Sequence, residues 1–414
     1  MLLFTIGVLL YTLGVKVAAL LGNSKAKQWV EGRKAQSQKL AERHAASQRQ
    51  ADWIWFHAAS LGEFEQGRPV IEALKRDYPQ CKILLSFFSP SGYEVRKDYP
   101  LADEVLYLPA DTPKNAAAWI GRHHFVAAFF IKYEFWFNYM RALKEAGIPL
   151  FYISLILNKK SYFFKPYGKT FRKQLSCVSH FFVQDETTAR LLEGIGYRNV
   201  TVCGDTRFDR VAAIAQQAKP FPEIERFIGG RHCIVAGSTW PSDESLLSGY
   251  MPKLPDGYCL IIAPHDISAG HVAQIQGLFP EACLYSELDA ERPSKVLVVN
   301  TIGILSQLYQ YARFAYIGGG FGAGIHNIQE SVTFGCPVVF GPKHKKFKEA
   351  VDLVALGGAF AIESQHDLDA AFSRLIADET FYAAASSICR VYLKSQLGAT
   401  ETILKNLPLS LKEA

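Results

Sequence analysis

The stretch WIWFHAASLGEFEQGRPVIEALKRDYP, residues 53–79, decides the fold class. It opens with a short apolar run, passes through small residues, and continues with apolar residues at helical spacing. That order is typical of one strand followed by one helix, the unit from which parallel sheets are built. Glu63 falls where the strand gives way to the helix. A carboxylate at that position serves either as a helix cap or as a catalytic base.

Short apolar runs and helical segments alternate along the chain in two series. The runs of the first series are 81–89, 104–111, 125–136, 148–155, 180–186 and 200–209, and those of the second are 232–239, 258–266, 295–303, 314–320 and 336–342. Runs that are apolar on both faces indicate parallel sheets covered by helices on both sides. A polar, proline-containing stretch at 213–230 separates the series. The sequence therefore predicts two doubly wound α/β domains, at 51–215 and 225–395, with 396–414 packing back on the first domain.

The N-terminal segment, residues 1–22, is apolar over about one membrane span and is interrupted only by Lys16. It lacks the basic start and the small-residue cleavage site of a secretory signal. Basic residues follow it, so we expect a single membrane anchor with the rest of the chain on the cytoplasmic side. A helix buried in the fold is the alternative. Residues 23–50, rich in Lys, Gln, Ala and Ser, predict a linker helix.

A net charge of +6 and eight scattered cysteines limit the classes of function. So mild a charge fits an acidic partner such as a phosphorylated or lipid surface, and it is too weak to argue for nucleic acid. Without a C-x-x-C pair, the cysteines suit reduced thiols facing the cytosol better than a disulfide framework or a zinc site.

The second domain carries a glycine-rich loop within YIGGGFGAGIHNIQESVTFGCPVVFGP, residues 316–342. Glycines let the backbone approach a ligand closely, and a helix opening near His326 and Asn327 would offer its N–H groups to a phosphate. Glu330, about one turn in, is placed to accept hydrogen bonds from a ribose. Neither the dinucleotide fingerprint nor a P-loop is present. The pattern favours a nucleotide-sugar site over a simple tight turn.

Three further strand ends in the second domain point to the same edge of its sheet. Ser238 and Thr239 close one strand just before a helix, as an anion pocket requires. Pro264 and His265 close another, although a lone histidine there is as often a capped turn residue as a ligand contact. Gly303, in NTIGIL, is predicted to open a helix.

Several motifs together resemble one bacterial family. HAASLGE, KYEFWFN, GDTRFD, AGSTWPSDE, NTIGIL, GGGFGAGIHNIQE and FGPKHKKFKEA occur in the order and at the separations of the 3-deoxy-D-manno-octulosonic acid (Kdo) transferases of lipopolysaccharide synthesis. The resemblance runs from the N-terminal anchor to about residue 400. It implies a GT-B fold, with two Rossmann-like domains facing a cleft. It also implies CMP–Kdo as donor, the lipid A precursor lipid IVA as acceptor, the cytoplasmic face of the inner membrane as location, and no metal or other cofactor.

The resemblance assigns roles by position. Glu63 matches the family's catalytic base, and Glu134 and Arg207 match two residues that stabilise the transition state. The stretches that hold CMP correspond to Pro264, His265, Ile302, Gly303, Ile304, Asn327, Ile328, Gln329 and Glu330. The residues' own pattern adds Ser238, Thr239, Gly319, Gly320 and His326 to the expected nucleotide site.

Several positions depart from the family pattern, among them Asp266 beside His265, and Lys132 and Phe137 around Glu134. Many members have Lys in place of Arg207, which keeps the charge but changes the hydrogen-bond geometry. An Arg usually follows the proline, where His265 stands, so a permanent positive charge is replaced by a titratable group or lost. The usual Glu is replaced by Ile304, which leaves only a backbone contact there.

The three residues of the first domain carry specific expectations. A helix N-terminus is expected to keep Glu63 ionised, with a turn at the preceding glycine lifting its carboxylate above the sheet edge. Glu134 lies at the end of a predicted buried strand and needs a cationic partner, either Lys132 or Arg207. Arg207 either neutralises the donor or forms a structural salt bridge with Asp205 or Asp209.

The segment NKKSYFFKPYGKTFRK, residues 158–173, interleaves cations with aromatic rings. That mixture suits an anionic lipid surface, so we expect a docking face for the acceptor's phosphates and acyl chains. The alternative is a solvated segment whose rings pack in the first domain. The cations are Lys159, Lys160, Lys165, Lys169, Arg172 and Lys173.

Two other functions stay open. One is a GT-B transferase that uses a different nucleotide-sugar on a lipid acceptor, and the other is a non-catalytic, membrane-bound protein that binds sugar nucleotides. The presence of both Ser-Leu-Gly-Glu and Gly-Asp-Thr-Arg-Phe-Asp argues against the first.

Overall fold

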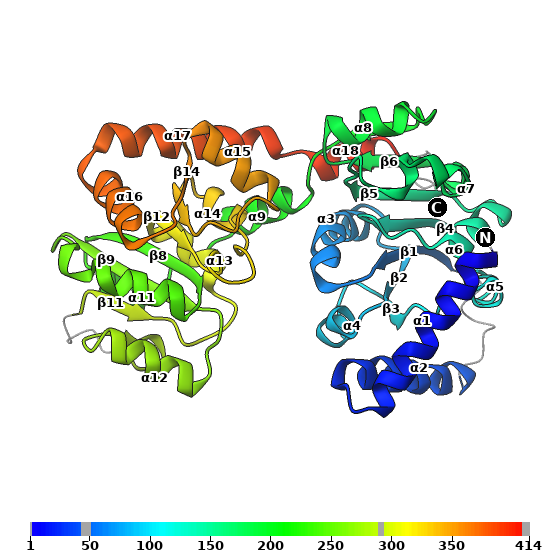
Figure 1. The fold of residues 1–414 in the computed structure, drawn as a ribbon, viewed down its shortest axis with the longest axis horizontal. Helices are drawn as coiled ribbons and strands as arrows, with labels where there is room; N and C mark the ends of the chain where they lie inside the picture. Colours follow the sequence, from blue (N-terminus) through cyan, green and yellow to red (C-terminus); the bar gives the residue numbers. More distant parts are fainter. Residues whose placement is uncertain (1, 43–50, 289–293, 408–414) are drawn as a thin grey trace. The chain divides into compact units, whose positions relative to one another are not determined.

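The computed structural model describes residues 2–42, 51–288 and 294–407, which form two α/β units (Figure 1). The first unit comprises the described residues up to Asp209 and those from Gly398 onward, and the second runs from Arg210 to Leu397. The first unit thus ends before residue 215, where the sequence placed the domain end. Residues 43–50 of the predicted linker helix and 408–414 of the predicted C-terminal segment lie outside the described residues.

The first unit is built on a sheet of seven parallel strands in the order β3-β2-β1-β4-β5-β6-β7. The strands are β1 (Asp52–Ala58), β2 (Lys82–Phe87), β3 (Glu104–Tyr107), β4 (His124–Ile131), β5 (Leu150–Leu155), β6 (His180–Val183) and β7 (Val200–Val202). Strand order reverses between β1 and β4. Ligands of such sheets bind at the carboxyl ends of the strands beside this switch point.

Helices connect the strands of the first unit, as the alternation of patterns predicts. They are α3 (Leu61–Asp77), α4 (Pro90–Arg96), α5 (Pro113–Ile120), α6 (Phe137–Glu145), α7 (Lys169–Gln174) and α8 (Glu186–Glu193), with α18 (Ala399–Lys405) added from the chain end. α18 contributes Ile403, which is fully buried in the same apolar cluster as Phe64 of α3.

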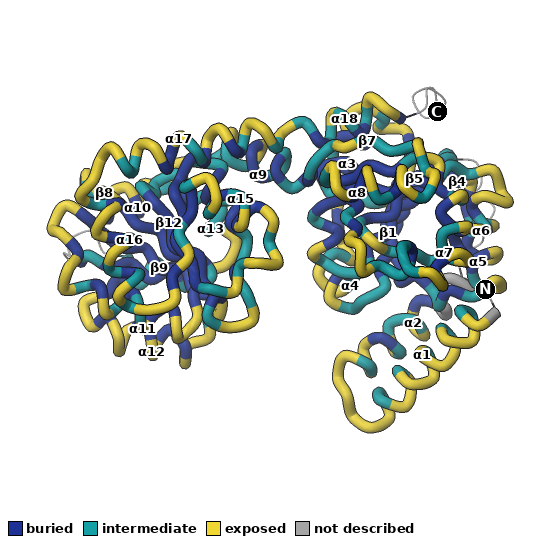
Figure 2. Tube along the Cα trace, turned by 45° about the horizontal axis from the view of Figure 1, so that its top comes forward, coloured by how far each residue is buried: buried dark blue, intermediate teal, exposed yellow. Residues whose placement is uncertain are grey.

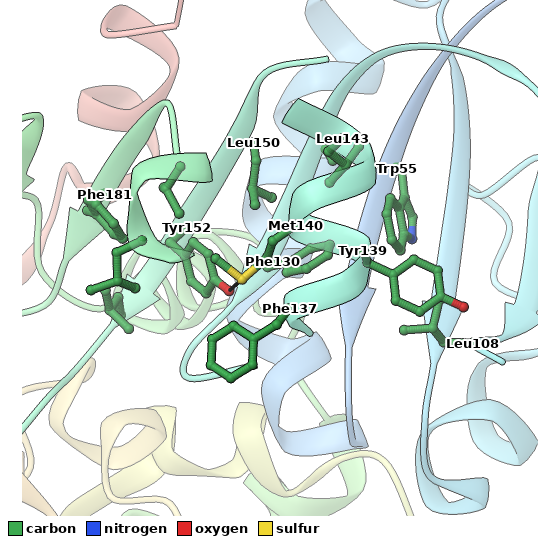
Figure 3. Close-up of a cluster of buried hydrophobic side chains, with 14 of the residues drawn as sticks. Trp55, Leu108, Phe130, Phe137, Tyr139, Met140, Leu143, Leu150, Tyr152 and Phe181 are labelled. Carbon is green, nitrogen blue, oxygen red and sulfur yellow. Dashed lines mark hydrogen bonds between the residues drawn. The ribbon is translucent and has the colours of Figure 1, made fainter. Parts of the chain in front are cut away.

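Large aromatic side chains fill the core between α6 and the sheet (Figure 3). Trp55 of β1 packs edge-on against Phe130 of β4, with ring centroids 5.0 Å apart, and against Tyr139 of α6 at 5.6 Å. Edge-to-face pairs of this kind stabilise beyond their buried area, by about 1 kcal/mol each. This packing fixes α6 on the sheet, and with it the loop that leads from β4 into α6.

The second unit repeats the plan with seven parallel strands in the order β10-β11-β9-β8-β12-β13-β14. The strands are β8 (His232–Thr239), β9 (Tyr258–Pro264), β10 (Cys283–Leu284), β11 (Val296–Val298), β12 (Ala312–Ile317), β13 (Val338–Phe340) and β14 (Ala359–Ala361). Here the order reverses between β8 and β12, so the switch point lies between the ends of these two strands.

The helices of the second unit differ widely in length. They are α9 (Arg207–Gln216), which starts in the first unit, α10 (Pro222–Ile228), α11 (Pro241–Tyr250), α12 (Ala269–Leu278), α13 (Leu305–Leu308), α14 (Gln329–Val332), α15 (Lys348–Leu356), α16 (Gln365–Ala377) and α17 (Glu379–Gln396). α13 and α14, which follow the predicted nucleotide-binding stretches, are single turns.

Two helices precede the first sheet and form a hairpin, α1 (Leu2–Leu20) and α2 (Ser24–Glu42). α1 is long and apolar enough to cross a membrane, and the window Leu3–Leu20 holds no buried residue; Figure 2 shows it as a largely exposed helix. α2 docks on the first unit through Gln36, whose amide bonds both the N–H and the C=O of Tyr107.

Candidate functional site

The switch point of the first sheet brings two predicted site residues together. Glu63 follows β1 and Glu134 follows β4, the neighbouring strands between which the strand order reverses. Because parallel strands end at one edge, residues 71 positions apart in sequence meet there.

Glu63 is both a cap and a member of this site. It is the third residue of α3, and its Oε2 accepts a hydrogen bond from the backbone N–H of Ser60, the N-cap residue, at 3.0 Å. The side chain is buried, with the residue 7% exposed. Gly62 has no left-handed backbone, so the expected glycine turn is absent, and open space surrounds the position where its Cβ would be.

Glu134 lies in a loop and not in a strand, because β4 ends at Ile131 instead of at residue 136. The next residue, Lys132, adopts a left-handed φ of 61°, which is costly for a residue with a side chain and turns the chain sharply. The Trp136 indole N–H donates to Glu134 Oε2 at 3.0 Å, and Tyr152 Oη–H donates to the Glu134 carbonyl at 2.8 Å. These bonds hold the carboxyl group in place.

The two carboxyl groups perturb each other. Partial burial, the negative charge of Glu63 and a hydrogen bond with its side chain raise the pKa of Glu134 to about 8. Burial also raises the pKa of Glu63, against the opposing pull of the Ser60 and Ala59 backbone N–H groups and the charge of Lys132. Two adjacent carboxylates cannot both ionise cheaply, so the pair holds one proton near neutral pH.

The structure bears on two sequence expectations about this pair. The helix N-terminus favours the charged form of Glu63, as expected, although burial acts against it and the net shift of the pKa is upward. The expectation of a cationic partner for Glu134 was wrong. Among the described residues, the side-chain partners of Glu134 are Trp136 and Glu63, and neither Lys132 nor Arg207 takes that place. The charge of Lys132 acts on Glu63 instead.

Arg207, the first residue of α9, forms a bidentate pair with Asp205. Its Nη2 lies 2.6 Å and its Nε 3.0 Å from Asp205 Oδ2, and Gln66 Nε2 donates to the same oxygen at 3.0 Å. Arg207 chiefly lowers the pKa of the buried Asp205, although desolvation opposes the shift. The salt bridge with Asp205 that the sequence offered as one alternative is thus present, whereas Asp209 binds elsewhere.

The glycine loop of the second unit is shaped by close packing of backbone against backbone. A Cβ on Gly318 would lie 2.2 Å from the carbonyl oxygen of Ser238, and one on Gly320 would lie 2.6 Å from the backbone of Gly341. The N–H of Gly319 donates to Asp243 at 2.9 Å. Gly318 and Gly320 thus leave no room for a side chain, because neighbouring backbone occupies the space. The Gly319 N–H is already bonded to a residue of the protein.

Thr239 does not form the expected anion pocket. Its hydroxyl donates to Glu244 Oε1 at 2.9 Å, and the other oxygen of that buried carboxyl contacts His271 Nε2 at 2.8 Å. A carboxylate facing Thr239 would repel an anion. Ser238 has a left-handed φ of 54°, which turns the chain at the end of β8.

Three aromatic side chains stack at the switch point of the second sheet. The His265 ring stacks on both Trp240 and His326, with ring centroids 4.7 Å and 4.5 Å away. The Trp240 indole N–H also donates to His326 Nε2 at 3.0 Å. The rings come from the ends of β8 and β9 and from the loop after β12, so the fold unites positions 86 residues apart.

The remaining predicted nucleotide residues surround two short helices. Asn327 precedes α14, its Oδ1 accepts from the Gln329 N–H at 3.0 Å, and its Nδ2 donates to Glu330 Oε1 at 3.3 Å. Helix α14 begins at Gln329 and α13 at Leu305, both later than predicted. Of the others, Ile302 is 81% exposed, and Gly303 beside it is also exposed. Ile304, just before α13, is half-buried, and the buried ones are Pro264, Gly319, Gly320 and Ile328.

The basic segment 158–173 divides into rings that pack and cations that face solvent. Phe163 is fully buried, and Tyr162, Phe164 and Phe171 pack against the same core, whereas Tyr167 is 70% exposed. Arg172 is internal, because its guanidinium donates to the carbonyls of Phe163 and Lys165. The exposed cations are Lys159, Lys160, Lys169 and Lys173, and Lys165 is half-buried.

Sequence reasoning missed several residues that shape these sites. Trp240 lies inside the quoted motif AGSTWPSDE, and an aromatic residue directly after a strand end was the available signal. Asp243, in the same motif, accepts from the N–H groups of Trp240 and Gly319 and from Tyr316 Oη. Nothing in the sequence shows this partnership, since it joins α11 to a loop that follows β12.

Comparisons with known proteins agree with this architecture. A family model described as 3-deoxy-D-manno-octulosonic-acid transferase (kdotransferase) matches residues 34–210. The Kdo transferase of Bordetella pertussis is 27% identical over 384 residues, covering 86% of each chain. That of Aquifex aeolicus is 24% identical over 332 residues, covering 78% of this chain and 86% of the relative. The solved UDP-GlcNAc 2-epimerase of Neisseria meningitidis shares the fold, with a TM-score of 0.61, 15% identity, and coverage of 86% and 98%.

Two units, each built on a sheet of seven parallel strands, define an α/β fold of the GT-B type, and the predicted fold class is confirmed. The family match covers most of the first unit, and the similarity to Kdo transferases extends through the second unit. Over most of its length, the chain is thus similar to Kdo transferases.

Proposed function

We propose that the chain transfers Kdo from CMP–Kdo to a hydroxyl of lipid IVA, with Glu63 as the general base. The observation that carries the proposal is the pair of carboxyl groups, Glu63 and Glu134, at the switch point of the first sheet. A hydroxyl is a poor nucleophile until a positioned base takes its proton. The raised pKa of Glu63 makes its carboxylate a stronger base than an exposed glutamate.

The surroundings give the two carboxyl groups different roles. Glu63 receives hydrogen bonds from backbone N–H groups and lies near Lys132, which both favour its charged form. Glu134 faces the charge of Glu63, which favours its protonated form. Separate surroundings commonly divide acid and base roles between two carboxyl groups in this way. A neutral Glu134 can donate a hydrogen bond without repelling the anionic donor.

In the proposed reaction, the acceptor oxygen bonds to the anomeric carbon of Kdo as the bond from that carbon to the phosphate oxygen breaks. The hydroxyl proton passes to Glu63, and the electron pair of the broken bond leaves with CMP. Asp205 fixes the guanidinium of Arg207, which we assign to neutralising negative charge on the donor. No metal takes part in this scheme.

For the second unit, we propose that CMP binds at the edge formed by Pro264, His265, Gly303 and the 326–330 turn. The stacked imidazoles of His265 and His326 support this assignment, because a ring N–H can donate to a phosphate. The exposed lysines 159, 160, 169 and 173 are proposed to meet the phosphates of the acceptor at the cytoplasmic face of the bacterial inner membrane.

The decisive test uses the full-length protein in detergent with CMP–Kdo and lipid IVA, with the product followed by mass spectrometry. We expect Kdo-extended lipid IVA in the presence of EDTA. Product only from another nucleotide-sugar, or none from any, would reject the assignment. Glu63→Gln should lower turnover by about 10²–10⁴-fold while CMP affinity changes little, as expected for loss of a general base. An active Glu63→Gln enzyme would remove Glu63 from the mechanism.

A further inference from the structure

The apolar helix α1 contacts the first unit near its start and in its middle. Near its start, the Phe4 ring lies 5.0 Å from that of Phe137, and Asn138 Nδ2 donates to Thr5 Oγ1 at 3.4 Å. In its middle, Tyr11 lies 6.2 Å from Phe88. At its end, the chain turns back into α2, which packs along α1 and onto the same unit (Figures 1 and 2).

These contacts do not fit a helix that crosses a bilayer. The hydrocarbon core of a membrane is about 30 Å thick, and the 18 residues of Leu3–Leu20 rise only about 27 Å. A crossing helix would therefore use its whole length, with Phe4 and Thr5 on the side away from the folded unit. Here both residues contact the start of α6, on the folded unit itself.

The two faces of α1 differ in what covers them. Residues that are partly covered recur at helical spacing and face α2 and the first unit: Phe4, Val8, Thr12, Val15 and Ala19. The opposite face carries large apolar side chains that are 42–87% exposed: Leu3, Ile6, Leu9, Leu10, Leu13, Val17 and Leu20. An exposed apolar face of this extent on one helix marks an interaction surface.

The charged residues of the α1–α2 hairpin indicate that the exposed apolar face of α1 binds a lipid surface. Lys16, the one charged residue of α1, is exposed, and a long cationic side chain can extend from an apolar layer to the headgroups. Lys25 and Lys34 of α2 are also exposed. Arg33 is different, since its guanidinium is stacked 3.7 Å from the Trp29 ring centroid and bonded to the carbonyls of Phe88 and Leu108.

We propose that α1 is an in-plane membrane anchor: its outer face lies in one leaflet of the bilayer, and its inner face is part of the folded first unit. The anchor then also supports the candidate active site. Phe137 and Asn138 directly follow the loop that carries Glu134, and the Phe88 ring that meets Tyr11 lies 4.7 Å from Trp136, which bonds the Glu134 carboxyl. Membrane attachment and the position of Glu134 are thereby linked.

Topology provides a test that does not depend on the proposed reaction. The full chain, with a protease-sensitive tag before Met1 and a second one after Ala414, is placed in sealed membrane vesicles whose outer surface carries the catalytic units. An in-plane anchor exposes both tags to added protease. A crossing helix protects the first tag while the second is cut, and that result would overturn the proposal.

A pair of variants separates the two faces of α1. Leu10→Glu with Leu13→Glu should weaken binding to vesicles of anionic phospholipid on the order of a hundredfold, because two large apolar side chains lose their burial. Its turnover on detergent-dispersed acceptor should stay unchanged. Phe4→Ala should retain vesicle binding and lose several-fold in turnover, a readout that rests on the proposed function. Unchanged vesicle binding of the double variant, or conversion of a dimer to a monomer by it, would contradict a lipid occupant.

Discussion

At the scale of single residues, the site depends on Glu63, whose carboxyl group both caps α3 and belongs to the carboxyl pair. As the third residue of α3, Glu63 bonds the backbone of its own N-cap, which fixes its rotamer. In its buried position beside Glu134, it also has a raised pKa, chiefly because of desolvation. The two roles reinforce each other, because a base that is already oriented by the helix start loses little entropy when it meets a substrate hydroxyl.

The carboxyl pair predicts a specific change in pH dependence. In Glu134→Gln, a neutral amide replaces a carboxyl group whose pKa is about 8 and which is therefore still protonated where Glu63 titrates. The acid limb of the kcat/KM profile, which reports the free enzyme, should stay in place, while a basic limb caused by ionisation of Glu134 should be lost. Measuring that profile for the wild type and the variant checks this, and a basic limb near pH 8 that persists in the variant would show that Glu134 does not cause it.

The same variant should alter stability, with a sign fixed by linkage. Glu134 has a pKa of about 8 in the folded protein against an ordinary value of 4.5. Between these values the folded state holds a proton that the unfolded state has lost, so this group's contribution to stability falls as the pH rises from 4.5 to 8. Glu134→Gln should therefore raise Tm more at pH 9 than at pH 5. The exposed Glu193→Gln is the matched control, with no such trend expected.

Single residues also mark where prediction from sequence stops. Glu63 and Glu134 were found because each stands beside a recognisable strand, but their contact depends on β1 and β4 being neighbours, which the sequence does not state. Burial also acts against the effect of the helix N-terminus on the pKa of Glu63, which the sequence does not show. The size of a desolvation effect depends on the packing around a group, and that is known only once the fold is known.

At the scale of elements, the glycine loop after β12 is organised by a carboxylate on another helix. Asp243 of α11 is 1% exposed and accepts from the Gly319 N–H, the Trp240 N–H and Tyr316 Oη. These three bonds connect the two strand ends, of β8 and β12, that form the switch point. The carboxylate therefore sets the position of the Trp240 ring and of the loop together.

Removing this carboxylate should weaken both the second unit and its nucleotide site. Asp243→Ala leaves three buried donors without a partner, so we expect a loss of about 3 kcal/mol in the free energy of unfolding, measured by urea denaturation. CMP affinity, measured by calorimetry, should fall as well. Ser364→Ala, which removes the cap of α16, is the control and should cost stability without a change in CMP affinity. Normal CMP affinity in Asp243→Ala would separate the loop from the site.

Element positions were predicted better than element ends. Runs of apolar residues located the long strands of both sheets, because burial on two faces leaves a clear pattern. The pattern failed where β4 stops at Ile131, since the apolar residues that follow it pack as a loop around Lys132. It also placed the starts of α13 and α14 too early. A single helical turn is stabilised by the residues packed around it, and its sequence shows little helical periodicity.

At the scale of the whole molecule, the chain leaves the first unit at Asp209 and returns at Gly398. The two chain segments that connect the units are hydrogen-bonded to each other at these points. Asp209 Oδ1 accepts from the Gly398 N–H at 2.7 Å, and its Oδ2 accepts from the Thr400 N–H. The sequence motif Gly-Asp-Thr-Arg-Phe-Asp thus combines two tasks, since its first aspartate holds Arg207 and its second holds the start of α18.

Asp209→Ala should release α18 while leaving the sheets folded. Two backbone N–H groups at the start of a short helix lose their acceptor, which costs about 1–2 kcal/mol locally. Ile403 and the rest of α18 stay on α3 through apolar contact alone, so local opening should become more frequent. Hydrogen exchange of the α18 amides should accelerate about tenfold or more, with exchange in β1 and β4 unchanged. Glu401→Gln, which removes an exposed ion pair with Lys405, is the matched control. If α18 exchanged equally slowly in both variants, apolar packing and not Asp209 would be what holds the returning chain.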